Sequence, residues 1–147
     1  MAAIKSGKFE SEIVPVDREG CSIERDECPV DIDQSEYSTY PTVFKKDGTV
    51  TKFNACGLND GASTVLLASR EKATELGLEI EAEVLGTAMV GCDPNTMGLG
   101  PVFAVKKLCK NIKINIEDVD LFELNEAFAS QSLACIKQLG VPAEKVD

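Results

Sequence analysis

The stretch DLFELNEAFASQ, residues 120–131, joins an apolar run to an Ala-rich segment through an Asn-Glu pair. Residues 119–124 (VDLFEL) have the composition of a strand, and residues 126–140 have the apolar spacing of a helix that ends at a glycine. A strand that leads into a helix is the repeating unit of parallel α/β sheets. Asn125 therefore lies at the carboxyl end of a predicted strand, where ligands bind in open α/β folds.

The alternation of strand and helix signals begins at residue 54. The continuously apolar or β-branched runs predict strands, and the runs with helical spacing follow good N-terminal signals such as Ser69 and Pro101. Strands are predicted at 62–69 and 80–88, and helices at 69–77 and 101–112. Strands that alternate with helices indicate parallel βαβ units, so the sequence predicts a layered α/β fold.

The first part of the chain, residues 1–53, is polar and rich in turn-forming residues. Its strand-like stretch is EIVPV at 12–16, and residues 18–41 combine many acids with little periodicity. The Asp-Gly pair in KKDGT, residues 45–49, predicts a tight turn between extended segments. We therefore expect an irregular, flap-like segment before the layered part.

Composition narrows the class of protein. The chain has 147 residues, 44% of them hydrophobic and 27% charged, with a net charge of -10, which is typical of a globular domain. The spread of acidic residues argues against nucleic acid and anionic membrane surfaces as partners, because both would repel it. No apolar run approaches the length of about 18 residues that a membrane helix needs, and the first residues lack the apolar stretch of a signal peptide.

Six cysteines and no histidine limit the chemistry that this chain can perform. The cysteines form no CxxC pair, so a zinc site is not expected, and a Cys–His nucleophile cannot be built. Several cysteines lie in apolar runs, where the thiol behaves as a small core group. We expect reduced thiols and a cytoplasmic location.

Three polar or flexible features each allow two interpretations from the residues alone. Asn125 could cap the helix that follows it, or its amide could hold a water or an oxyanion. Residues 54–63 (NACGLNDGAS) could form a tight turn, or Gly57 could let a ligand approach the backbone closely. Met97, between glycines, could line a slot or fill the core.

Four motifs together resemble the thiolases, the family that makes or cleaves 3-ketoacyl-CoA. The motifs are EIVPV (12–16), FKKDGTVTKFNACGLNDGAS (44–63), DPNTMGLGP (93–101) and DLFELNEAFASQ (120–131). The resemblance runs almost from end to end, and Asn-Glu-Ala-Phe downstream of Pro-x-x-Met-Gly-x-Gly-Pro is its most specific part. Related decarboxylating synthases have a histidine motif in this region, so the sequence resembles the thiolases proper.

The resemblance implies roles for individual residues. Asn125 resembles the asparagine whose bound water contributes to the oxyanion hole for the substrate thioester. Met97 resembles the methionine of the acyl pocket, and Phe128 the aromatic wall beside it. A coenzyme A thioester is the implied substrate, with no metal and no separate cofactor.

Contacts with the pantetheine arm of CoA are implied for the remaining candidates. Phe44 resembles an aromatic residue near the pantetheine. Cys56 stands where the family has the serine of Asn-Ala-Ser-Gly, and it is a much weaker hydrogen-bond partner than that serine. Gly57 follows Cys56 in the first of these motifs, and Ala127 precedes Phe128 in Asn-Glu-Ala-Phe. Both complete the implied CoA-binding set. An expected basic residue near the adenine is replaced by acids in DECPVDIDQSEY, residues 26–37.

The family's complete chain is much longer and duplicates its core. It also has a nucleophilic cysteine, a Gly-His-Pro histidine and a second catalytic cysteine, none of which has a match here. The resemblance thus implies a truncated portion of the duplicated thiolase fold. Its parts are the end of the loop domain (1–53), the last strand and helix of the N-terminal core (54–78) and the first half of the C-terminal core (79–147).

The implied function is that of an acyl-CoA acyltransferase of lipid metabolism, working by Claisen condensation of two acetyl-CoA or by thiolytic cleavage of 3-ketoacyl-CoA. The chain by itself is expected to be inactive. Its expected partners are CoA and the remainder of the thiolase polypeptide or other subunits, with a homo-oligomer for the complete enzyme. The alternatives are a non-catalytic CoA-binding or interaction module derived from a thiolase, and an unrelated α/β domain.

Two expectations concern the structure directly. The candidate residues from separate motifs should surround one cleft at the strand ends: Asn54, Cys56, Met97, Asn125 and Phe128. Apolar side chains that lack neighbours within this chain should be exposed: Leu66, Leu67, Val102 and Phe122.

Overall fold

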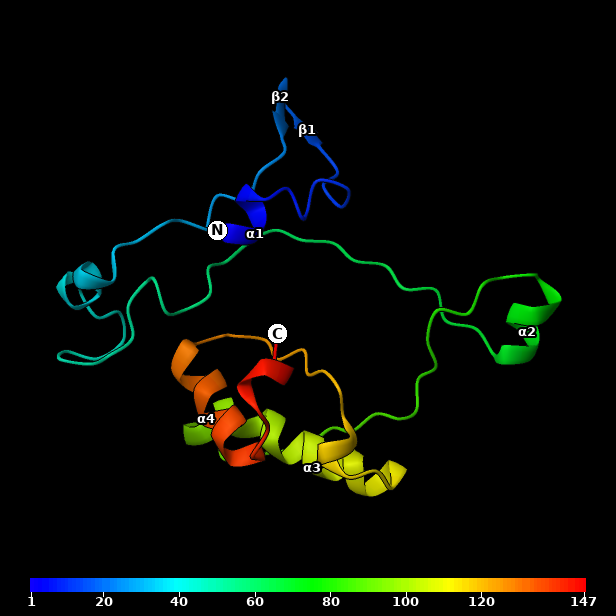
Figure 1. Ribbon diagram of the computed structural model, residues 1–147. Coiled ribbons are helices and arrows are strands. Elements are labelled where there is room, and N and C mark those ends of the chain that lie inside the picture. The colour runs from blue at the N-terminus through cyan, green and yellow to red at the C-terminus, as the bar shows by residue number, and fades with distance from the viewer. The chain divides into compact units, whose positions relative to one another are not determined.

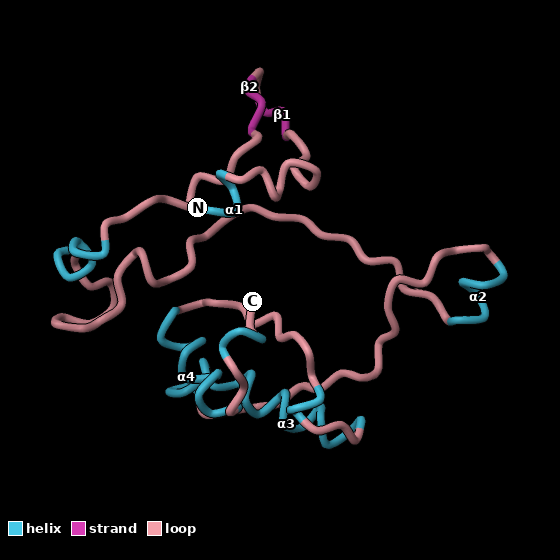
Figure 2. Tube along the Cα trace, viewed as in Figure 1, coloured by secondary structure: helices cyan, strands magenta, loops and turns pink.

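The computed structural model describes residues 1–147. The chain divides into two compact units, Met1–Phe53 and Asn54–Asp147. The first unit contains helix α1 (Ala2–Lys5), strands β1 (Val16–Arg18) and β2 (Cys21–Ile23), and the 3₁₀ helix η1 (Gln34–Thr39). The second contains α2 (Arg70–Glu75), η2 (Pro94–Leu99), α3 (Gly100–Ile112), η3 (Ile116–Asp118), α4 (Ala129–Leu139) and η4 (Ala143–Lys145) (Figures 1 and 2).

The first unit is built around short turns. β1 and β2 form an antiparallel hairpin in which Val16 faces Ile23. Its two-residue loop, Glu19-Gly20, has φ values of 52 and 83, which are those of the type I′ turn that matches strand twist. The strand predicted at 12–16 is wrong, because Pro15 has no N–H to give to a ladder and the strand begins only after it.

The tight turn predicted at 45–49 is confirmed. The Gly48 N–H donates to the Lys45 carbonyl at 3.0 Å, and the Val43 N–H donates to the Val50 carbonyl at 2.9 Å. Asp47 takes a left-handed φ of 57 within the turn.

An aromatic cluster completes this unit. The Tyr40 and Phe53 rings meet edge to face with centroids 4.3 Å apart, and the Lys52 ammonium lies over both rings. The Tyr40 hydroxyl donates to the Glu36 carboxylate, and this negative partner raises the pKa of Tyr40.

Helices α3 and α4 pack together with η2 and form the core of the second unit. The side chains of Val102 and Cys135 are 1% and 0% exposed. The helix predicted at 101–112 is confirmed, with Pro101 in its first turn. The expectation that Val102 is exposed is wrong, because α4 and η2 supply neighbours within the chain that cover α3.

The helix predicted to begin at residue 126 and to be stopped by Gly140 forms and ends at Leu139, as predicted, but it starts later, at Ala129. Its N-cap is Phe128, whose backbone is extended, with φ -144 and ψ 139. The helix ends at Gly140, which takes the left-handed conformation with φ 70, as a C-terminal glycine does. Residues 125–128 therefore connect Leu124 to the helix, because Phe128 pairs with Ala55 instead of entering the helix.

The predicted strands at 62–69 and 80–88 are wrong as elements of a ladder, since both segments are loops (Figure 2). No backbone hydrogen bond joins residues 62–68 or 79–88 to the rest of the chain. The strand predicted at 119–124 is also wrong, since these residues form only an isolated parallel bridge between Phe122 and Val146. A strand needs a neighbour to satisfy its N–H and C=O groups, and these segments find little or none within the chain.

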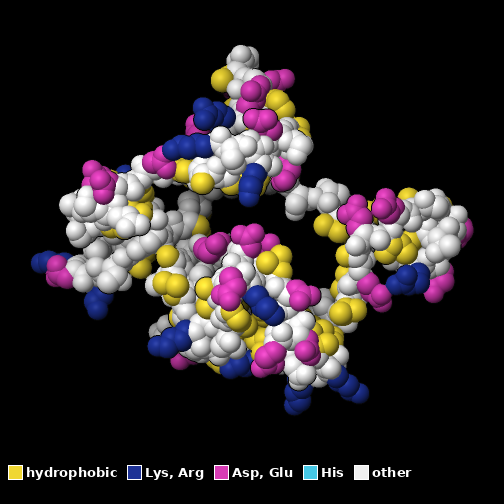
Figure 3. Space-filling model, in the orientation of Figure 1, with side chains coloured by type: hydrophobic (Ala, Val, Ile, Leu, Met, Phe, Trp, Pro, Cys, Tyr) yellow, Lys and Arg dark blue, Asp and Glu magenta, His cyan; other side chains and the backbone are white.

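Between these two loops lies the short helix α2. Ser69 caps it as predicted, accepting the Lys72 N–H at 3.2 Å, and Gly77 follows it with φ 63. Hydrogen bonds from its own backbone N–H and from Ser69 hold the pKa of Glu71 below its usual value. Acidic and hydrophobic side chains share the surface around α2 (Figure 3). None of the helices has the length and apolar character that a membrane crossing requires.

Candidate functional site

Two motifs that are far apart in the sequence meet through their backbones. The Cys56 N–H donates to the Ala127 carbonyl, and the Ala129 N–H donates to the Asn54 carbonyl, both at 3.0 Å. Ala55 and Phe128 form the antiparallel bridge between these bonds. The pairing satisfies one of the free N–H groups at the start of α4. It also places Cys56 close to Ala127 and Phe128.

Residues 93–100, which include η2 and are called the Met97 loop below, pack on α4. Asp93 starts this loop by accepting the Asn95 backbone N–H at 2.9 Å. At its other end, the buried Cys135 thiol of α4 donates to the Gly98 carbonyl at 3.2 Å. The Met97 side chain itself is 69% exposed, so the interpretation of Met97 as a core filler is wrong.

Asn125 lies in the connection before α4. The N-cap of α4 is Phe128, and no side chain caps the helix, so the interpretation of Asn125 as the cap is wrong. The Asn125 side chain is exposed and makes no hydrogen bond within the chain. Its amide donors and carbonyl acceptor are therefore available to a water or a ligand.

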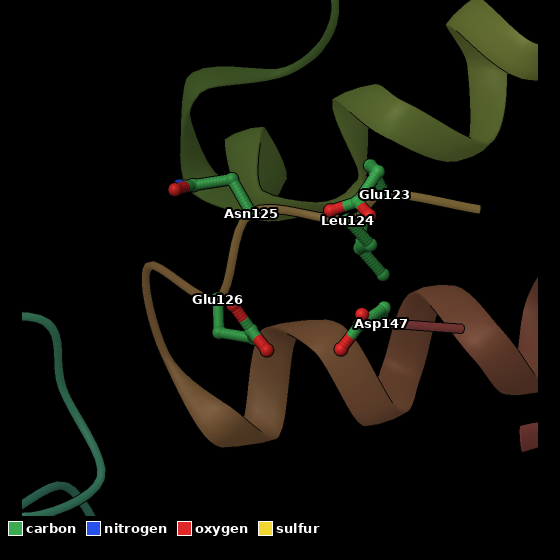
Figure 4. Close-up of a pocket in the computed structure, with 5 residues that line it drawn as sticks. All are labelled: Glu123, Leu124, Asn125, Glu126 and Asp147. Carbon is green, nitrogen blue, oxygen red and sulfur yellow. The ribbon is translucent and has the colours of Figure 1, made fainter. Parts of the chain in front are cut away.

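A shallow pocket of about 490 Å³ borders this connection. Its lining residues are Glu123, Leu124, Asn125, Glu126 and Asp147. In Figure 4 the Asn125 amide points away from the Glu126 and Asp147 carboxylates. The acidic side of the pocket would repel a phosphate, whereas the Asn125 side carries a neutral amide.

The position of Asn125 is fixed by backbone pairing on its N-terminal side. The Phe122 N–H donates to the Lys145 carbonyl at 2.8 Å, and the Leu124 N–H donates to the Asp147 carbonyl at 3.1 Å. The bridge at Phe128 fixes the chain on the other side. Asn125 thus lies between two backbone segments that are fixed by hydrogen bonds, and these restrict the directions in which its side chain can point.

The structure thus joins some of the candidates and leaves others separate. Cys56, Gly57, Ala127 and Phe128 belong to the paired motifs, and the Met97 loop lies against α4. Phe44 belongs to the unit Met1–Phe53, so its place near the others stays a prediction. The single cleft around Asn125 and Met97 also stays a prediction. No group of three or more Cys, Asp or Glu side chains is arranged to hold a metal ion.

Sequence reasoning missed the residues that hold the Met97 loop. Cys135 and Gln131 face Gly98 from α4. The signal that could have found them is the spacing: Phe128, Gln131 and Cys135 lie on one face of the helix, and a cysteine among apolar residues is small enough for a loop to approach.

Comparison with known proteins gives a consistent result over the whole chain. Residues 1–71 match the family model "Thiolase, N-terminal domain", and residues 78–147 match "Thiolase, C-terminal domain". The acetyl-CoA acetyltransferase of Chromobacterium violaceum is 46% identical over 99% of this chain and 39% of its own length. The chain therefore spans well under half of that relative.

Solved structures agree with this match. A crystal structure of the Bacillus anthracis acetyl-CoA acetyltransferase superposes with a TM-score of 0.89 at 43% identity, over 99% of this chain and 38% of that one. The dimeric peroxisomal thiolase of Saccharomyces cerevisiae gives 0.90 at 37% identity, with the same coverage. The chain thus resembles these proteins in its α/β fold as well as in its sequence, and it belongs to the thiolase family.

Proposed function

We propose that this chain supplies the oxyanion-binding asparagine and part of the CoA channel of an acyl-CoA acyltransferase. The reaction is the Claisen condensation of two acetyl-CoA or the thiolytic cleavage of a 3-ketoacyl-CoA. The observation that carries the proposal is the pairing of residues 54–56 with residues 127–129, which leaves the Asn125 amide without a partner in the chain at the start of α4.

Asn125 has a defined task in this chemistry. A water held by its amide donates to the oxygen of the thioester as negative charge develops there. Removal of one such donor typically lowers kcat by roughly 10²–10³. The donor assists only when a thiolate attacks and a base generates that thiolate. This chain contains no histidine, so we propose that the base and the nucleophile belong to other thiolase segments.

The surface of the second unit supports such a partner. Residues 62–68 and 79–88 have no backbone hydrogen bonds to the rest of the chain. A groove of about 900 Å³ lies between Thr64–Ala68 and Leu78–Val84. Leu66 and Leu67 are 80% and 73% exposed, as expected, whereas Phe122 is half-buried. Loop segments with unpaired backbone groups and exposed apolar side chains are suited to pairing with strands of another segment.

We therefore propose that strands from the rest of a thiolase polypeptide, or from a companion subunit, occupy this groove. In the relatives, the part that matches this chain makes up 38–39% of a longer chain. The completed assembly would be the unit that forms the homo-oligomer, in the cytoplasm with reduced thiols. The acidic border formed by Glu123 and Glu126 supports a pantetheine site beside Asn125, and not a phosphate site.

A chimeric enzyme tests the proposal. This chain replaces the matching part of the Chromobacterium violaceum acetyl-CoA acetyltransferase, and thiolysis of acetoacetyl-CoA is followed by thioester absorbance. We expect activity in the chimera and none in the isolated chain. Asn125→Ala should lower kcat of the chimera by roughly 10²–10³, while Asn111→Ala, on the exposed side of α3, serves as the control.

Two results would contradict the proposal. Equal kcat values for the Asn125→Ala and Asn111→Ala chimeras would remove Asn125 from the reaction. Turnover by the isolated chain would show that the missing base and nucleophile are not needed. Calorimetry with CoA then addresses the alternative function: micromolar binding by the isolated chain would favour a CoA-binding module, and no binding would favour a part of a larger enzyme.

A further inference from the structure

A buried thiol of helix α4 binds the backbone of the Met97 loop. Cys135 on α4 is 0% exposed, and its Sγ donates to the Gly98 carbonyl at 3.2 Å. The Gln131 Nε2, one turn earlier, donates to the same sulfur at 3.6 Å. The two bonds form a short relay from Gln131 through Cys135 to the loop. The thiol is thus both acceptor and donor, which is the full hydrogen-bonding capacity of a cysteine.

The loop also lies very close to α4. A Cβ added at Gly98 would lie 2.9 Å from the Gln131 Cγ and 3.5 Å from its Cβ. Real Cβ atoms do not approach so closely, so any larger residue at 98 must displace the loop or the Gln131 side chain. Gln131 is restrained in turn, because its Nε2 bonds Cys135. The contact therefore depends on glycine for its closeness and not for its φ.

This arrangement leaves one polar atom of Gln131 without a hydrogen bond. Its Oε1 is buried and has no hydrogen-bond partner, and a buried polar atom without a partner is costly. Rotation toward solvent would satisfy the Oε1 but would break the bond to Cys135. The packing against Gly98 must offset this cost, which indicates that the position of the loop depends on Gln131.

We propose that Cys135 and Gln131 are positioning residues that fix Met97 by holding the Gly98 carbonyl against α4. Met97 projects outward from the loop, 69% exposed. The Cys135 thiol binds the carbonyl of the next residue, Gly98, while the Cys92 thiol donates to the Met97 carbonyl at 3.9 Å. The position of the thioether is therefore set by α4, the same helix whose start carries the Phe128 bridge. The relevance to acyl-chain length rests on the proposed function, in which Met97 lines the acyl pocket.

The test uses the methyl groups of methionine as reporters. The chain has three methionines, so a protein labelled with methyl-¹³C methionine gives signals from Met1, Met89 and Met97. Cys135→Ala should shift or broaden the Met97 signal, and Met89, which is 88% exposed, should not respond. Cys135→Ser retains a donor and should restore the Met97 signal. That rescue separates the hydrogen bond from simple packing.

A glycine pair provides the matched control. Gly98→Ala should shift the Met97 signal as Cys135→Ala does. Gly91→Ala should leave it unchanged, because nothing lies within 4 Å of a Cβ at that position. Unchanged Met97 signals in Cys135→Ala and Gly98→Ala, or failure of Cys135→Ser to restore the signal, would overturn the proposal. The proposed function is tested separately by the kcat of the Asn125→Ala chimera, so its failure would leave the result for Met97 unchanged.

Discussion

Two regions of the second unit have similar apolar character but opposite exposure. In the helical region, residues 100–147, Val102 and Cys135 are almost completely buried. In the loop region, which comprises residues 57–69 and 76–91 on either side of α2, Leu66 is 80% exposed and Val84 is 68% exposed. The loop region holds runs such as TVLLA that are as apolar as any part of α3. Hydrophobic residues in a sequence thus indicate where burial is favourable, but burial also requires a neighbour.

The helical region has such neighbours within the chain. α3, η2 and α4 pack on one another, and each helix satisfies its own backbone hydrogen bonds. A strand lacks this independence, because its N–H and C=O groups point sideways toward the next strand. The difference teaches that helices can pack with few neighbours, whereas extended segments without a neighbouring strand remain unpaired.

The largest expected effect comes from one substitution made in both regions. Val102→Ala removes buried methyl groups and should lower the free energy of unfolding by about 2 kcal/mol. Val84→Ala removes the same atoms from an exposed side chain and should change it by less than about 0.5 kcal/mol. Urea denaturation followed by far-ultraviolet circular dichroism measures both. Equal losses would mean that the loop region is packed in solution.

A smaller effect is expected at the two glycines that end helices with a left-handed backbone. Gly140 after α4 has φ 70 and Gly77 after α2 has φ 63, with open space around both. Alanine is strained in this conformation by roughly 1–2 kcal/mol. Gly140→Ala should therefore lower the urea midpoint of the helical region. Gly77→Ala should speed amide exchange in α2 without moving that midpoint, and a common shift of the midpoint would contradict the comparison.

The smallest effect is the pH dependence of α2. The pKa of Glu71 is lowered below 4.5 by the hydrogen bonds to its own N–H and to Ser69. A carboxyl group whose pKa is lower in the folded state stabilises the helix at pH values above its unfolded-state pKa. This stabilisation is lost as the pH falls through the folded-state pKa. Amide signals of α2 should thus weaken below about pH 4.5, while those of α4 persist.

The control for this titration is Ser69→Ala. It removes the cap of α2 and one of the two groups that hydrogen-bond the Glu71 carboxylate. Loss of an N-cap typically costs about 1 kcal/mol, so α2 should be weaker at neutral pH and its remaining acid dependence should be smaller. An unaltered titration in Ser69→Ala would show that Ser69 does not set the pKa of Glu71.

The local features of the fold could be predicted from the residues. Pro101, Ser69 and the glycines at 77 and 140 mark helix ends because each residue type satisfies a backbone requirement by itself. The Asp-Gly turn at 47–48 follows from the same local chemistry. The start of α4 was misplaced because a distant segment, 54–56, holds Phe128 in an extended conformation.

The candidate site shows the same division. The sequence by itself determined the residue types: an asparagine between a strand-like run and a helix, a methionine between glycines, and a chain without histidine. Tertiary structure alone decided that Asn125 does not cap α4, that Cys135 holds the Met97 loop and that Val102 is buried. The physical reason is the range of the forces involved. Caps and turns depend on atoms a few residues apart, whereas pairing and burial depend on which distant segment arrives beside them.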